Sequence, residues 1–302
     1  MRKTLPAYLN LSEGEFERKV KALYKMMSPC RLCPRSCAAK RLNGEKGICG
    51  VSNLPMVSAY HLHFGEESVL VGRGGSGTIF FTGCSLKCVY CQNYEISQLM
   101  WGEVVSVNDL AEMMLELQSA GAENINLVTP SHQVPFIVEA IMIASRKGLT
   151  LPIVYNSSGY DSVETLKILE GVIDIYMPDA KYSNSEASLK YSQIPDYFEV
   201  MKKALKEMHR QVGDLIIENG IAVRGLLVRH LVLPKHLAGS EKILSFIAQE
   251  ISKDTFVNIM SQYYPTYKAH QFPELSRRIT KDEYMEVLKM AKKLGLKRAE
   301  RY

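Results

Sequence analysis

The sequence predicts an α/β fold: a partial (β/α)6 barrel of the TIM type, preceded by a small cysteine-rich metal-binding subdomain. After residue 77, short and nearly continuous apolar runs alternate with amphipathic stretches, as buried parallel strands alternate with crossover helices. All seven cysteines fall in two clusters, one before these runs and one directly after the first of them. About six strand–helix units fit the chain, which is fewer than the eight of a closed barrel.

The expected strands are six apolar runs. In such a barrel, the carboxyl ends of the parallel strands meet at one face, where functional sites form. Residues that directly follow a run are therefore the first candidates for a site. The runs are 78–82, 124–128, 153–156, 173–177, 226–233 and 257–260.

The expected helices are recognised from their caps and apolar stripes. Ser106 predicts the start of a helix that ends near Gly121. Asp161 and Glu164 have capping-box spacing before a helix that ends at Gly171. Further helices fit near 12–27, at 133–147, 196–211 and 241–252, and after Thr280, which has capping-box spacing to Glu283. The resulting divisions are 1–65 for the first helix and the cysteine-rich subdomain, 66–265 for the barrel and 266–302 for a helical extension.

The composition is that of an ordinary globular protein. Its 37 basic and 32 acidic residues give a net charge of +5, spread along the chain, so we expect no nucleic-acid partner. No apolar run is long enough to span a bilayer, and the first residues lack the apolar core of a signal peptide. We therefore expect a cytoplasmic protein, in which clustered cysteines hold metals more often than disulfides.

The second cysteine cluster consists of Cys84, Cys88 and Cys91, with the spacing C-x3-C-x2-C and Tyr90 before the last cysteine. Three thiolates at this spacing can hold one cubane iron–sulfur cluster and leave its fourth iron without a protein ligand. A structural zinc site is the alternative, but it normally needs a fourth ligand, which is not nearby in the sequence. The motif therefore predicts a [4Fe-4S] cluster with an open coordination position.

This motif, followed by parallel strand–helix units, resembles the radical S-adenosylmethionine (SAM) superfamily, and more narrowly the pyruvate formate-lyase-activating enzyme-like (PflX-type) proteins. The resemblance covers most of residues 60–265. It implies an oxidoreductase that cleaves SAM reductively to a 5′-deoxyadenosyl radical and removes a hydrogen atom from a protein or peptide substrate. It also implies a one-electron reductant such as flavodoxin or ferredoxin. A radical SAM enzyme for a small molecule, and a non-catalytic iron–sulfur electron carrier, stay open as alternatives.

The resemblance also implies residues that contact SAM. Tyr90 matches an aromatic position beside the adenine, and Asn93 matches an asparagine near the cofactor. Asp179 and Lys181 match a pair that contacts the methionyl and ribose groups, as a carboxylate and an ammonium can. The other implied contacts are Arg229 on the fifth strand and, for the ribose, Asn156 and Ser157 after the third. Strand-end side chains of these types are otherwise often only solvated.

One stretch departs from the family pattern. Where the family usually has Gly-Gly-Glu after the second strand, this chain has Thr129, Pro130, Ser131 and His132. The methionyl amino group must then be held differently, by carbonyls, by the hydroxyl of Thr129 or Ser131, or by a neutral His132. The alternative for His132 is a helix N-terminal residue without a role.

The first cysteine cluster offers four thiolates, enough to close a tetrahedral metal site. Structural zinc is the first expectation, and an auxiliary iron–sulfur cluster is the second. Free or disulfide-bonded cysteines remain a third interpretation. The four residues are Cys30, Cys33, Cys37 and Cys49.

Two pairs of polar residues lie between the cysteine clusters. His61 and His63 point to one side if the chain is extended there, as metal ligands would. Two histidines alone are more often solvated or packed. Glu66 and Glu67 follow, and the sequence alone predicts no role for them.

Overall fold

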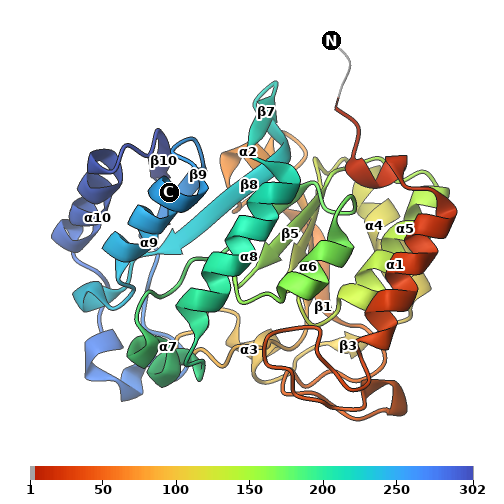
Figure 1. The fold of residues 1–302 in the computed structure, drawn as a ribbon, viewed down its shortest axis with the longest axis horizontal. Coiled ribbons are helices and arrows are strands. Elements are labelled where there is room, and N and C mark those ends of the chain that lie inside the picture. The colour runs from red at the N-terminus through yellow and green to blue at the C-terminus, as the bar shows by residue number, and fades with distance from the viewer. Residues whose placement is uncertain (1–3, 302) are drawn as a thin grey trace.

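The structure is a computed structural model that describes residues 4–301. A curved, largely parallel sheet forms its centre, and helices cover the outer face of the sheet (Figure 1). The strand order is β10-β9-β8-β6-β5-β4-β2-β1-β3, with β7 paired to β8. Among the described strands, the two edges β10 and β3 do not pair with each other, so the barrel is open on that side. The predicted mixed α/β class with a parallel sheet is confirmed.

Six strands pair in parallel in the order that the sequence predicts. The fourth of these strands begins later than expected, after the polar residue Asp174. The fifth begins earlier than expected, because a hairpin extends it before Leu226. The strands are β2 (Ser76–Phe81), β4 (Ile125–Val128), β5 (Ile153–Ser157), β6 (Ile175–Pro178), β8 (Ile221–Leu231) and β9 (Phe256–Met260).

Four further strands were not predicted. They lie at the sheet edges, where alternating or charged sequences replace continuous apolar runs. One of them lies in the segment that we expected to be a helical extension. They are β1 (Met56–His63), antiparallel to β2; β3 (Glu103–Val104), on β1; β7 (Ile216–Glu218), antiparallel to β8; and β10 (Arg298–Arg301), parallel to β9.

The predicted helices are all present, and two predicted caps are correct. Ser106 and Thr280 each form a capping box. The prediction for Asp161 is wrong, since Ser162 is the cap and Asp161 accepts hydrogen bonds from other side chains. The helices are α1 (Glu13–Lys25), α4 (Val107–Ser119), α5 (Val134–Arg146), α6 (Val163–Leu169), α8 (Tyr197–Val212), α9 (Ser240–Phe246) with a π-helical turn after it, and α10 (Lys281–Lys293). Shorter helices are α2 (Ser68–Val71), α3 (Tyr94–Ser97) and α7 (Ser185–Ser192).

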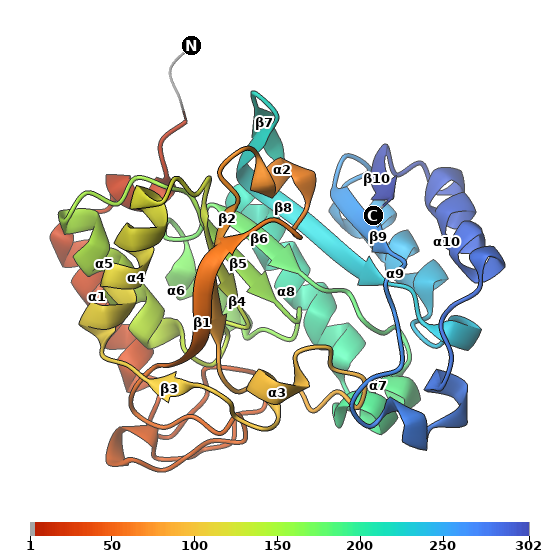
Figure 2. The same ribbon diagram turned by 180° about the vertical axis from the view of Figure 1, so that it is seen from behind.

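Residues 4–65 pack on the sheet and its helices. Leu23 of α1 is fully buried, Tyr24 donates a hydrogen bond to Glu139 of α5, and Lys19 donates to the carbonyl of Ile168 in α6. The cysteine-bearing loop that follows α1 lies beside α3 and β3 (Figure 2). This end of the molecule is where the parallel strands end.

The amino end of the barrel interior is closed by α2. Val69 and Leu70 of α2 pack against interior residues such as Val154, Ile175 and Leu227. This apolar plug leaves the opposite, carboxyl end of the interior for a site.

None of the helices in residues 4–301 is both long and apolar enough to cross a membrane. The first three residues of the chain, on which the expectation of no signal peptide partly rests, lie outside the described part.

Candidate active site

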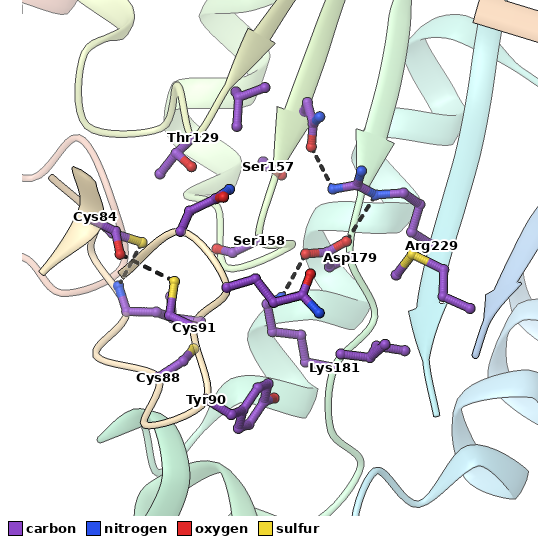
Figure 3. Close-up of a pocket in the computed structure, with 18 of the residues that line it drawn as sticks. Cys84, Cys88, Tyr90, Cys91, Thr129, Ser157, Ser158, Asp179, Lys181 and Arg229 are labelled. Carbon is purple, nitrogen blue, oxygen red and sulfur yellow. Dashed lines mark hydrogen bonds and ion pairs between the residues drawn. The ribbon is translucent and has the colours of Figure 1, made fainter. Parts of the chain in front are cut away.

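A cleft of about 220 Å³ lies at the carboxyl ends of β4, β5, β6, β8 and β9, against the loop that carries the second cysteine cluster (Figure 3). The structure brings together predicted residues that are far apart in the chain, from Cys84 to Arg229. The predicted residues that line it are Cys84, Cys88, Tyr90, Cys91, Asn93, Thr129, Asn156, Ser157, Asp179, Lys181 and Arg229.

Each thiol of the second cluster has a hydrogen-bond partner. The backbone N–H of Leu86 donates to Cys84 Sγ over 3.4 Å. Cys88 Sγ lies 2.9 Å from Ser192 Oγ, and Cys91 Sγ lies 3.2 Å from Ser97 Oγ. Hydrogen bonds to sulfur are one means by which a protein sets the reduction potential of an iron–sulfur cluster.

Burial raises the pKa of two of these thiols, those of Cys84 and Cys88. It raises the pKa of Cys84 to about 12, and the neighbouring Cys88 and Cys91 add to the effect. It raises the pKa of Cys88 to about 11, against the opposing influence of Lys181. The thiols of Cys84 and Cys88 therefore need the positive charge of bound iron to become thiolates.

The donor set of this loop fits a [4Fe-4S] cluster. Three free thiols line one cleft, and Lys181 lies close enough to Cys88 to lower its pKa. In this arrangement two of the thiols turn to serine hydroxyls, and no three His, Cys, Asp or Glu side chains of residues 4–301 form a ready metal site. The ligand assignment therefore stays a prediction.

Asp179 connects two cations across the cleft. Its Oδ1 accepts from Arg229 Nε over 3.0 Å, and its Oδ2 accepts from Lys181 Nζ over 2.6 Å. Burial alone would raise the pKa of Asp179, but Arg229 and Lys181 outweigh it and hold the pKa below its ordinary value. Arg229 also donates from Nη2 to Asn156 Oδ1 over 2.6 Å. The side chains are 15–18% exposed, so this ion-paired group faces the cleft rather than bulk water.

Tyr90 lies in an aromatic layer beneath the cysteine loop. Its ring meets the rings of Tyr182 and Tyr263 edge to face, with centroids 6.3 and 5.8 Å away. Tyr90 is only 5% exposed, so its position is fixed by packing. Asn93 is the N-cap residue of α3, without a side-chain cap bond, and its side chain is left for the cleft.

Thr129 adopts an uncommon backbone conformation at the end of β4. Its φ is +61°, which a β-branched residue rarely adopts, and its N–H donates to the Asn156 carbonyl over 2.9 Å. Glycine, which the family has here, adopts this φ freely. The turn after β4 is thus made in this chain by a residue for which this φ costs energy.

The structure does not bring Ser131 and His132 to the cleft. Ser131 Oγ donates to Asp161 over 2.6 Å. His132 is 1% exposed, donates from Nε2 to the Thr82 carbonyl over 2.9 Å, and its carbonyl accepts from Arg41. Neither residue lines the cleft, contrary to the expected placement: the Ser131 hydroxyl and His132 Nε2 are bonded to buried partners outside it.

The four cysteines of the first cluster lie next to one another. Cys30, Cys37 and Cys49 all help to raise the pKa of Cys33 to about 12, after burial as the main cause. A Cβ on Gly47 would lie 3.2 Å from Cys37 Sγ and 3.4 Å from Cys49 Sγ, so the glycine leaves room between two thiols. As in the second cluster, the predicted metal ligation stays a prediction.

The two cysteine clusters are neighbours in space. The Cys49 carbonyl packs directly against Gly83, where any Cβ would collide with it, and Gly83 precedes Cys84. Arg35 of the first loop donates from Nε to the Ser85 carbonyl over 2.9 Å. A metal held by either cluster would therefore sit beside the loop of the other.

Several residues of the cleft were not predicted. Ser158 and Gln262 follow β5 and β9, so their place after a strand was a signal that the sequence offered. Met260 and Leu231 lie at the last positions of β9 and β8, where apolar residues gave no signal.

The sequence is similar to a known protein family and to two uncharacterised proteins. The model of the radical SAM superfamily matches residues 78–247, which is more than half of the chain. The uncharacterised protein MJ0674 of Methanocaldococcus jannaschii is 32% identical over 286 residues, covering 92% of this chain and 78% of that protein. A second uncharacterised protein of that organism, MJ0808, is 22% identical over 299 residues, covering 90% of this chain and 79% of that protein.

Solved structures with a similar arrangement are more distant. A domain of a pyruvate-formate lyase-activating enzyme from Bacteroides vulgatus aligns with a TM-score of 0.40 and 10% identity, over 55% of this chain and 89% of that one. TYW1 with a lysine-pyruvate adduct aligns with a TM-score of 0.47 and 12% identity, over 72% and 73%. The matched family model, which spans more than half of the chain, carries the conclusion: this chain belongs to the radical SAM superfamily.

Proposed function

We propose that this radical SAM enzyme acts on a protein or peptide substrate, in the manner of the activating enzymes that its sequence resembles. The observation that carries the radical chemistry is the Asp179 bridge between Lys181 and Arg229 beside three cysteines in one cleft. The open side of the barrel supports a large substrate, because a closed mouth would favour a small one.

With the reduced cluster and SAM bound, the chemistry supplied is reductive cleavage of SAM to a 5′-deoxyadenosyl radical, which takes a hydrogen atom from the substrate. The residues of the chain bind, orient and exclude water. Lys181 offers an ammonium to the methionyl carboxylate, and Asp179 offers a carboxylate oxygen to the ribose hydroxyls. Tyr90 and Asn93 would hold the adenine side. Thr129 would direct the end of β4 toward the methionyl amino group.

The remaining parts of the proposal rest on the sequence. They are a one-electron reductant such as flavodoxin or ferredoxin, a cytoplasmic location, and the divisions 1–65, 66–265 and 266–302. In the first cysteine cluster, zinc is the first choice and an auxiliary iron–sulfur cluster the second, since four thiolates serve both.

Formation of 5′-deoxyadenosine tests the radical chemistry. The protein is reconstituted with iron and sulfide without oxygen, reduced with dithionite, and given SAM. We expect 5′-deoxyadenosine, and a change in the electron paramagnetic resonance signal of the cluster when SAM is added. No 5′-deoxyadenosine together with an unchanged signal would overturn the proposal.

Two cysteine variants separate the two clusters. Cys88→Ala should lose the [4Fe-4S] cluster of the second cysteine cluster and all SAM cleavage. Cys37→Ala is the matched control, because it removes one thiol of the other cluster. It should lose the second metal, read as zinc or as additional iron by metal analysis. Full iron and activity in Cys88→Ala would contradict the ligand assignment.

A further inference from the structure

A polar layer crosses the barrel interior next to the cleft, on the side of α2. Asn126 precedes the cleft residue Val128 by two positions on β4, so both face the interior. Asn258 on β9 pairs with Arg229 on β8, again two positions before a cleft residue, Met260. The segment before α2, near the top of the barrel in Figure 2, adds Glu66 and Glu67.

Direct contacts connect this layer to the cleft. Asn258 donates from Nδ2 to Glu67 Oε1 over 2.7 Å. Glu66 Oε2 lies 3.6 Å from Arg229 Nη1, and Arg229 is the cation that Asp179 holds in the cleft. Asn126 lies close enough to Glu66 to lower the pKa of that carboxyl. A group bound in this layer would therefore sit directly beside the radical site.

Four polar atoms in the layer have no hydrogen-bond partner. They are Oδ1 and Nδ2 of Asn126, Oδ1 of Asn258, and Oε2 of Glu67. Asn126 is 0% exposed, and Asn258 and Glu67 are each 3% exposed, so water outside the protein does not reach them. Such atoms are rare in folded proteins because each carries an uncompensated desolvation cost. Their grouping points to a ligand that supplies the missing bonds.

The charges in the layer are also incomplete. Three carboxylates, of Glu66, Glu67 and Asp179, surround two cations, Arg229 and Lys181. Burial raises the pKa of Glu66 to about 7 against the opposing influence of Arg229, and the neighbouring Glu67 adds to the rise. One further positive charge would allow all three carboxylates to stay ionised.

We infer that this layer binds a protonated primary amine of the substrate, adjacent to a hydrogen-bond acceptor of the same molecule. The three unpartnered oxygens match the three N–H donors of an ammonium group. The one unpartnered donor, Asn126 Nδ2, matches the neighbouring acceptor. A bare metal ion fits less well, because it has no acceptor for that donor and leaves it unpaired.

The open edge of the sheet carries polar side chains on the same face. Thr78 of β2 pairs with both Asn126 and His61, so these three side chains share the interior face of the sheet. His61 is exposed and stacks on Phe80, with ring centroids 5.4 Å apart. The histidines that the sequence singled out therefore lie on this face of the sheet, near its open edge.

This inference rests on the proposed function, and its test is chosen to be independent of radical chemistry. Saturation-transfer NMR on the reconstituted enzyme measures the binding of glycinamide, which carries an ammonium next to a carbonyl. Acetamide, which lacks the ammonium, is the matched probe. We expect glycinamide to bind and acetamide not to bind. SAM cleavage by the wild-type enzyme is measured separately, so failure of the radical chemistry is seen without reference to the amine.

Two variants test the residues. Glu67→Gln should weaken glycinamide binding by about tenfold or more, the scale expected for a hydrogen bond to a charged group, whereas Glu17→Gln on exposed α1 should not. Asn126→Leu should abolish binding and raise the melting temperature of the free enzyme, because it removes two unpartnered buried atoms.

A purely structural role of Asn126 predicts the opposite change in melting temperature. Equal binding of both probes, or unchanged glycinamide binding in Glu67→Gln and Asn126→Leu, would overturn the inference. A crystal structure at saturating glycinamide with only water at Glu67 would do the same.

Discussion

Asp179 meets two requirements whose energetic effects oppose each other. It must be buried beside the cleft, which disfavours its charge, and it must stay ionised to hold Lys181 and Arg229. The two cations resolve the conflict and keep its pKa low. The residue is therefore a positioning residue for both, whatever direct contact it makes with SAM.

Replacing this carboxylate tests that role. We expect Asp179→Asn to weaken SAM binding and lower SAM cleavage strongly, because removing one partner of a buried ion pair leaves buried charges uncompensated, at a cost of about 3–5 kcal/mol. SAM affinity and the rate of 5′-deoxyadenosine formation are measured together. Glu199→Gln is the control, since it breaks the exposed pair with Lys202 and should change neither. An Asp179→Asn enzyme with normal SAM affinity would show that the bridge is dispensable.

His132 makes the stability of the protein depend on pH. Burial lowers its pKa to about 3, from 6.5. The unfolded chain takes up the proton first, so the stability contribution of neutral His132 is present above pH 6.5 and is lost as the pH falls toward 3. Between pH 6.5 and about pH 5 the loss should be about 2 kcal/mol. Urea unfolding of the wild type and of His132→Gln over this pH range measures this loss, as a difference in how steeply the free energy of unfolding changes with pH. An equal pH dependence of the two proteins would contradict the prediction.

Single residues were predictable where chemistry and position coincide. The three cysteines and the polar residues Asn156, Asp179 and Arg229 at strand ends lie in the cleft, as expected. Ser131 and His132 do not, because the direction of a side chain after a strand depends on a turn that the sequence pattern does not encode. Glu66 and Glu67 precede a helix of four residues, too short to show periodicity, so their burial could not be foreseen.

At the scale of elements, the contact between the two cysteine loops depends on Gly83. Its φ is +84°, and the Cys49 carbonyl occupies the place of a Cβ. We expect Gly83→Ala to push the two loops apart and to lower the metal content of both clusters. Gly148→Ala is a matched control: its φ is +98°, but no atom lies within 4 Å of the Cβ position. Metal analysis and visible absorbance compare the two. Equal metal content in both variants would mean that only the positive φ matters.

The elements themselves were predictable to different degrees. Buried parallel strands have continuous apolar runs, so all six were recognised. β1 reads as polar and apolar in alternation and is half exposed, and β10 is charged, so neither stood out. Both are held by pairing with a neighbouring strand rather than by their own sequence. Tertiary context of this kind is the part that local patterns miss.

At the scale of the whole molecule, α1 joins the amino-terminal part of the chain to the helices of the barrel. The sequence predicts a separate subdomain up to residue 65, whereas Leu23 is fully buried and α1 packs against α5 and α6. β1 in the same part pairs with β2 of the barrel. If these contacts join the parts energetically, then loosening α1 should loosen the barrel and its cluster together.

Leu23→Ala is the variant that decides between one cooperative unit and two. Removing a fully buried leucine side chain should cost about 2–5 kcal/mol. We expect thermal unfolding followed by far-UV circular dichroism and by the visible absorbance of the cluster to shift downward together, by equal amounts. Leu189→Ala on α7, where the side chain is 54% exposed, should shift neither. A barrel and cluster that unfold at the wild-type temperature, after an earlier transition in Leu23→Ala, would establish the first 65 residues as an independent subdomain. Equal downward shifts of the two unfolding temperatures would instead assign the first cysteine cluster to the same folded unit as the radical site. We expect this result, because the Cys49 carbonyl packs against Gly83.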